Sequence, residues 1–340
     1  MPIRVATVRA ADVPSSQTDM PVYVDLGRVG ATALTLAEAE SSRWYTDTDL
    51  VTQMAREIVS LTEGHGKYAS LTSTSKIAID YDGIRADLAV GNTYGRNAVW
   101  SGNFSFVYHM EDNSNDSSGN GINGTDTSMS YNTSAGKIKK GADFNGSTGQ
   151  IRNTHDFPSS YTHSFWFLQN NSTTGRVVIA KDGANRNMVY HWVGSPDNYL
   201  QFFTWNSSNS LKFIRSANGT VPQTTWVKLD IVWDNSGNYT YYVNGVVGAT
   251  DNNVATSGAP RDTVSDDLWF GNRSTPNAPN AQYLDEVKFS SVVRSANWIT
   301  TEYNNQNDEA TFWGTWTTFG GGGFTPTPLM HMRMMAGGGV

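Results

Sequence analysis

The chain has 340 residues, a formal net charge of −7 and no cysteine. This length is enough for two domains with cores of their own. The absence of cysteine excludes disulfides, thiolate metal sites and a cysteine nucleophile. The acidic balance opposes a nucleic-acid-binding surface, for which a basic face is expected. This charge leads us to expect no nucleic acid binding. No apolar run is long enough to cross a bilayer, so we also expect no membrane insertion.

The composition indicates an all-β protein. Charged residues make up only 16% of the chain, whereas 12% are aromatic. Short aromatic and β-branched runs alternate with clusters of Asn, Gly, Ser and Asp, which is typical of strands joined by turns. The first residues contain no apolar run followed by a cleavage site, so no signal peptide is visible.

Residues 1–100 predict an N-terminal β domain. Strands are expected at residues 21–26 (PVYVDL), around 58–59 and around 77–81, with a short helix or ordered loop at 34–44. The order of these segments, which ends in TYGRNAVW, resembles a DUF2341-type domain. This is a domain of unknown function that commonly precedes laminin-G-like modules in bacterial surface proteins and phage structural proteins. The resemblance implies a β-sandwich architecture and no chemistry.

Residues 226–298 carry the clearest strand signals. Asn244-Gly245 lies between two apolar runs and predicts a type I′ hairpin turn. Farther on, Asp285-Glu286 interrupts the apolar positions of a last strand. Residues 227–234, before the turn, alternate between apolar and polar side chains, and this period of two predicts a half-buried strand. The apolar positions are Val227, Leu229, Ile231 and Trp233, and the polar positions are Lys228, Asp230 and Asp234.

This stretch and two earlier ones, FSFVYHMEDNSNDSSGN from residue 104 and GKIKKGADFNG from residue 136, resemble a laminin-G-like, concanavalin A-like jelly roll. The resemblance covers residues 104–307 and implies two stacked antiparallel sheets, closed by a helix for which Ser295 is the expected N-cap. We therefore predict two tandem β-sandwich domains. The predicted boundaries are 1–100 for the N-terminal domain, 101–318 for the jelly roll and 319–340 for a glycine-rich linker and methionine-rich tail.

The jelly-roll resemblance also allows a glycoside hydrolase, which needs two carboxylates about 5–5.5 Å apart for a retaining reaction. Hydrolases of this fold supply them from a Glu-x-Asp-x-x-Glu strand, and the sequence has no such spacing. Asp285 and Glu286 are adjacent, so they should face opposite sides of a strand. The six histidines are scattered and form no zinc motif. We therefore expect no enzyme activity.

Calcium is the candidate cofactor. Related jelly rolls hold a calcium ion with acidic residues near the opening and last strands, and the matching positions are Asp112 and Asp285, with Asp116 as a third candidate. The alternative is that Asp116 forms an Asx turn and Asp285 binds local backbone amides.

A doubled aromatic pattern predicts the ligand site. If residues 189–193 and 199–205 form a hairpin, both of its faces are partly apolar, and one must be the inter-sheet core. The other face needs a partner, which is a sugar, the first domain or another subunit. The alternative is that these aromatics only pack. The predicted carbohydrate-binding residues are Tyr190, Trp192, Tyr199, Gln201 and Trp205.

Residues 320–340 begin with four glycines, which form a flexible link, and continue with a methionine-rich run suited to docking. We expect this tail to bind other virion or surface-assembly subunits; the alternative is a disordered end. The expected function is a non-enzymatic structural or decoration protein of the virion exterior that adheres to carbohydrate or host surfaces. The alternatives are a secreted or cell-surface carbohydrate-binding protein of a prokaryote and, third, a glycoside hydrolase.

Overall fold

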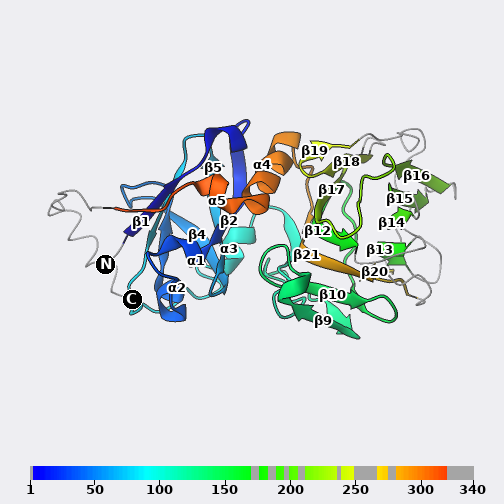
Figure 1. Ribbon diagram of the computed structural model, residues 1–340, viewed down its shortest axis with the longest axis horizontal. Helices are drawn as coiled ribbons and strands as arrows, with labels where there is room; N and C mark the ends of the chain where they lie inside the picture. Colours follow the sequence, from blue (N-terminus) through cyan, green and yellow to red (C-terminus); the bar gives the residue numbers. More distant parts are fainter. Residues whose placement is uncertain are drawn as a thin grey trace.

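The computed structural model describes residues 3–169, 176–182, 189–194, 199–205, 211–235, 239–248, 266–274 and 281–319. Figure 1 shows two bodies side by side, the first built from the N-terminal strands and the second from the central part of the chain. Three antiparallel sheets account for the strands of these residues, which confirms the all-β prediction. None of the helices in the described ranges is long and apolar enough to span a membrane.

The first body contains a seven-stranded sheet in the order β2-β5-β4-β3-β6-β1-β22. Its short helix α2 lies within residues 34–44, the range predicted to form a short helix or ordered loop. The helix begins there because Thr35 and Glu38 form a capping box. The strands are β1 (Ile3–Thr7), β2 (Gln17–Asp25), β3 (Arg43–Tyr45), β4 (Gln53–Ser60), β5 (Glu63–Leu71), β6 (Lys76–Asp80) and β22 (Thr317–Thr318). The helices are η1 (Ala10–Asp12), α1 (Leu26–Val29), α2 (Leu36–Ser41) and α3 (Arg96–Trp100).

The second body is a jelly roll of two sheets. One has the order β19-β18-β17-β12-β21-β10-β9, with β7 also paired to β21, and the other has the order β16-β15-β14-β13-β20-β11-β8. The first sheet comprises β7 (Phe104–Tyr108), β9 (Met129–Asn132), β10 (Gly141–Asn145), β12 (Tyr161–Gln169), β17 (Val227–Trp233), β18 (Tyr239–Val243), β19 (Val246–Val247) and β21 (Ala281–Ser290). The second comprises β8 (Thr125–Thr127), β11 (Gln150–Asn153), β13 (Arg176–Asp182), β14 (Val189–Gly194), β15 (Tyr199–Trp205), β16 (Leu211–Arg215) and β20 (Asp267–Phe270); η2 (Thr133–Ala135) precedes β10.

The jelly-roll core lies between its two sheets. Phe165 and Leu229 come from one sheet, Leu200 and Phe270 come from the other, and all four are fully buried in one cluster. The predicted hairpin turn is confirmed, because Asn244-Gly245 joins β18 to β19 with φ of 52° and 76°.

The prediction that β17 is half-buried is wrong, because every one of its residues is buried. The polar face is covered by helix α4 (Ala296–Asn307), which starts at the predicted N-cap Ser295. There Lys228 lies 2.6 Å from Asp230 and 2.7 Å from Glu302 of α4. Period-two alternation gives the direction of each side chain, whereas only the fold decides what covers it.

The C-terminal segment, α4 followed by α5 (Glu309–Trp313) and β22, contacts both bodies (Figure 1). The amide of Asn305 binds both backbone groups of Tyr23 on β2, at 2.6 and 3.0 Å. Trp298 and Phe312 belong to the core cluster of the first body. Residues 296–318, predicted as the end of the jelly roll, therefore hold it against the first body.

Candidate functional site

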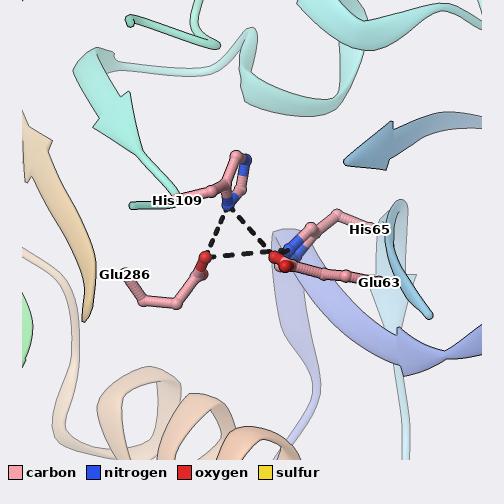
Figure 2. A group of neighbouring side chains, drawn as sticks. All are labelled: Glu63, His65, His109 and Glu286. Carbon is pink, nitrogen blue, oxygen red and sulfur yellow. Dashed lines mark hydrogen bonds and ion pairs between the residues drawn. The ribbon is translucent and has the colours of Figure 1, made fainter. Parts of the chain in front are cut away.

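A cluster of four ionisable side chains is buried where the two bodies meet. Glu63 and His65 lie on β5 of the first body, His109 follows β7, and Glu286 lies on β21. Each is at most 5% exposed. One donor atom from each lies within 4.8 Å of the others. Figure 2 shows the four side chains converging from these separate elements.

The sequence of β5 explains two of the four positions. Alternation in Glu63-Gly64-His65-Gly66 places the two functional side chains on one face and the two glycines on the other. The indole of Trp44 occupies the glycine face. A Cβ added at Gly64 would lie 2.9 Å from this ring, and one added at Gly66 would lie 2.8 Å from it. Close backbone approach to Trp44 therefore fixes β5 in place.

The other two positions depend on unusual backbone geometry. Met110, directly after His109, has φ of 62°, and Glu286 has φ of 49°. The register between β12 and β21 also shifts between Ser164 and Trp166, opposite this part of β21. Such left-handed residues are rare outside glycine and gather at functional sites.

The two histidines face two carboxylates at short range. His109 Nδ1 is 2.5 Å from Glu286 Oε1 and 3.5 Å from Glu63 Oε1. His65 Nε2 is 2.9 Å from Glu63 Oε1 and 3.9 Å from Glu286 Oε1. The imidazoles are stacked, with centroids 4.5 Å apart and planes inclined by 28°.

Glu57 forms a second layer behind His109. One of its oxygens lies 3.0 Å from His109 Nε2 and accepts a hydrogen bond of 2.5 Å from the indole of Trp100. The other accepts one of 2.8 Å from the hydroxyl of Ser117. Since Glu57 accepts from Nε2, the ring presents Nδ1 to the cluster.

A chain of buried ion pairs continues from the cluster to α4. Lys288 lies 2.8 Å from Glu286 and 3.2 Å from Glu302, and Glu302 also binds Lys228. Burying these charges is costly, and removing one partner of such a pair typically costs about 3–5 kcal/mol. The interface is therefore ionic at its centre.

Burial and neighbouring charge separate the protonation states of the cluster. Burial lowers the pKa of His65 to about 3. Burial also acts to lower the pKa of His109, but Glu286 and Glu57 outweigh it and raise this pKa to about 10. Burial and the charge of Glu286 raise the pKa of Glu63 well above its ordinary value. These opposite shifts favour the charged form of His109 and the neutral form of His65.

A pocket of about 290 Å³ is lined by residues of both bodies and extends to His109 of the cluster. Glu57, which lies behind His109, also lines it. Arg56, Glu111 and Asn113 belong to the same polar lining. The pocket gives small polar species a route to the buried imidazole.

The three predicted metal ligands are not brought together. Asp112 is exposed and pairs with Lys140 at 2.6 Å. Asp116 accepts from the amide of Ser118 at 2.8 Å, which is an Asx turn, and Asp285 accepts from two backbone amides, of Lys137 and Ile138. Within the described ranges, only the Glu63, His65, His109 and Glu286 group has three or more His, Asp or Glu ligand atoms this close.

The predicted β14–β15 hairpin is present, with Trp192 opposite Gln201 and Tyr190 opposite Phe203. Tyr199 and Gln201 are half-buried, whereas Leu200 between them is in the core. The side chains of Tyr190, Trp192 and Trp205 lie outside the described residues. The five predicted carbohydrate-binding residues therefore stay a prediction.

Sequence reasoning missed the histidine cluster, because its members lie up to 223 positions apart (residues 63 to 286). The local signal was Glu63-x-His65, a spacing that puts both side chains on one face of a strand. Nothing local connects this pair to His109 or to Glu286.

Residues 143–300 match the family model described as the concanavalin A-like lectin/glucanases superfamily, so a domain of this type is present. No curated protein matches the sequence. Among solved structures, the binding domain of Paraclostridial Mosquitocidal Protein 1 has 16% identity and a TM-score of 0.50, over 63% of this chain and 55% of that one. The binding domain of botulinum neurotoxin serotype D has 14% identity and a TM-score of 0.49, over 60% and 52%.

A third similar structure is domain 4 of AbnA, an extracellular arabinanase from Geobacillus stearothermophilus, in complex with arabinotriose. It has 19% identity and a TM-score of 0.45, over 58% of this chain and 97% of that one. The present chain spans about half the length of the toxin binding domains it matches. At 16% identity, the likeness to the binding domain of Paraclostridial Mosquitocidal Protein 1 shows the fold alone.

Proposed function

We propose that this protein is a non-enzymatic binding protein whose jelly roll holds carbohydrate on the outer face of β14–β16. The match of residues 143–300 to the concanavalin A-like lectin/glucanases superfamily supports a binding role. The observation that carries the proposal is the arrangement of Tyr199, Gln201 and Arg215. In Figure 1, β14–β16 lie at the end of the molecule away from the first body.

These three residues form a polar and aromatic surface beside the core. The guanidinium of Arg215 lies 3.5 Å from the ring centroid of Tyr199, which fixes the orientation of the ring. Gln201 is the cross-strand partner of Arg215 on one side and of Trp192 on the other. An oriented ring packs on the apolar face of a sugar, and amide and guanidinium groups donate hydrogen bonds to hydroxyls.

The buried carboxylates described above support binding without turnover. Glu302 and Asp230 form ion pairs with Lys228, and Glu286 forms ion pairs with Lys288 and His109. Hydrolysis needs an acid and a base that flank a bound sugar. A reducing-sugar release assay on any glycan that binds tests whether the protein is non-enzymatic. Catalytic release of reducing sugar would overturn this part of the proposal.

A glycan array on the full chain, with and without calcium, tests binding. Alanine at Trp192, Tyr199, Gln201 or Trp205 should abolish binding without loss of fold, and Tyr94→Ala, an exposed aromatic of the first body, is the control. Silence of the wild-type protein on a broad array would overturn the proposal. Dependence on calcium would support the predicted calcium cofactor.

We also propose the virion exterior as the location, with residues 320–340 as the segment that joins other subunits. The proposed location rests on the resemblance of residues 1–100 and 104–307 to modules of phage structural and bacterial surface proteins. Immunogold electron microscopy of the native source separates a virion from a prokaryotic cell surface. Deleting residues 320–340, which lie outside the described residues, should leave a folded protein that no longer joins its assembly; unchanged incorporation would refute the docking role.

A further inference from the structure

We propose that Glu63, His65, His109 and Glu286 bind one divalent transition-metal ion of the zinc type, which joins the two bodies of the protein. This site is separate from the proposed carbohydrate surface. Two ligands come from β5 of the first body and two from β7–β21 of the jelly roll (Figure 2).

The spacing of the four donor atoms fits tetrahedral coordination. Bonds of 2.0–2.2 Å place the ligand atoms of such a site about 3.4 Å from one another. The four imidazole-to-carboxylate distances are 2.5, 2.9, 3.5 and 3.9 Å, which lie on both sides of this value. Side-chain shifts of about 1 Å or less would therefore admit the ion.

A buried oxygen that lacks an N–H or hydroxyl donor points to the same ligand. Glu63 is fully buried, its Oε2 receives no hydrogen bond from an N–H or hydroxyl group that the structure describes, and the carboxyl of Glu111 places a second acid beside it. Such a group is costly inside a protein unless a donor or a cation satisfies it. Coordination of a cation by the Glu63 carboxylate removes this cost.

The surroundings of His109 have the form of a metal-ligand second layer. Glu57 accepts from Nε2, which leaves Nδ1 for the ion, and Trp100 and Ser117 hold Glu57 in turn. A carboxylate behind a ligating imidazole fixes the ring and increases its basicity. The left-handed backbone at Glu286 is a further constraint at a ligand position.

The donor set selects the class of metal. Two imidazole nitrogens with two carboxylate oxygens suit zinc and its neighbours in the first transition row, whereas calcium takes oxygen ligands only.

The ion would be structural, because all four positions of a tetrahedral site are filled by protein. It would lie between the two bodies and replace hydrogen bonds by coordination bonds across their interface. The pocket that His109 lines gives the ion a way in.

The first test uses the full chain after treatment with a chelator. Titration with Co²⁺ should give one equivalent of binding with the intense visible absorption of a four-coordinate site. Zn²⁺ should displace the Co²⁺, and a large excess of Ca²⁺ should not. Zn²⁺ in excess should raise the midpoint of thermal unfolding by about 5 °C. A folded wild-type protein that binds neither Co²⁺ nor Zn²⁺ stoichiometrically overturns the proposal, and the cluster is then a hydrogen-bonded network alone.

Variants locate the site. Glu63→Gln and His65→Gln keep side-chain size close to the original and should abolish stoichiometric Co²⁺ binding, while Glu57→Gln should weaken it by about 10–100-fold. His155→Gln, a buried histidine outside the cluster, is the matched control and should bind as the wild type does. Circular dichroism checks each fold. Unchanged Co²⁺ binding in both folded ligand variants overturns the assignment, even if the wild type binds metal.

Discussion

His65 of the first body stacks on His109 of the jelly roll, with ring centroids 4.5 Å apart. The indole of Trp100 lies 5.4 Å from each of the two imidazoles. Carboxylates flank the pair on either side, Glu63 next to His65 and Glu286 next to His109. The interface between the bodies is thus a buried polar centre, in which the position of each group depends on both bodies.

Gly64→Ala should disturb this centre from the opposite face of β5. The added methyl would lie 2.9 Å from Trp44, a large ring that is itself fully buried. Overpacking of this kind costs about 1–3 kcal/mol. Urea denaturation measures the loss, and Co²⁺ titration should show weaker binding because Glu63 and His65 shift with the strand. Gly91→Ala, where nothing lies within 4 Å, is the control; equal stability of the two variants would contradict the role of Trp44.

Glu302→Gln should change the stability of the protein in a pH-dependent way. Burial acts to raise the pKa of Glu302, but Lys228 and Lys288 outweigh it and lower this pKa from 4.5 to about 2. A depressed pKa stabilises the fold above pH 4.5, and this contribution is lost as pH falls toward 2. The variant should be less stable than the wild type by roughly 3 kcal/mol at pH 7, with a smaller difference at pH 3.

Chemical denaturation of both proteins at the two pH values measures this difference. Asp112→Asn removes a carboxylate whose lysine pair is exposed to solvent, and it should cost less than about 0.5 kcal/mol at either pH. A stability difference for Glu302→Gln that does not narrow toward low pH would show that the lysines do not hold Glu302 ionised.

Leu200 and Gln201 should respond in opposite ways to alanine. Leu200→Ala removes a fully buried side chain from the inter-sheet core and should cost about 2–5 kcal/mol. Gln201→Ala, on the other face of the same strand, should change the free energy of unfolding by less than about 1 kcal/mol while it abolishes glycan binding. Thermal unfolding and a glycan-binding assay distinguish the two effects. If Gln201→Ala unfolds the jelly roll, its side chain belongs to the packing.

Gly245→Ala should destabilise the hairpin between β18 and β19. Its φ of 76° disfavours any side chain, and a Cβ there would lie 3.0 Å from Cβ of Tyr303 on α4. We expect a loss of about 1–3 kcal/mol in urea denaturation. Asn244→Gly, which keeps the positive φ allowed, should remain within about 1 kcal/mol of the wild type. If Gly245→Ala left the free energy of unfolding unchanged, α4 would not approach this turn.

The strands and turns of this protein follow from local sequence. Asn244-Gly245 determines its own turn, because both residues tolerate positive φ. Ser295 determines the start of α4, because its side chain accepts from the amide of Trp298.

What covers each strand was decided only by the tertiary structure. Lys228 and Asp230 have the spacing of a solvent-facing row, yet α4 buries them against Glu302. The histidine cluster arises in the same way, since Glu63-x-His65 meets Glu286 only when β5 and β21 lie across one interface. Alternation along a strand specifies the direction of a side chain, and the packing of distant elements determines its partner.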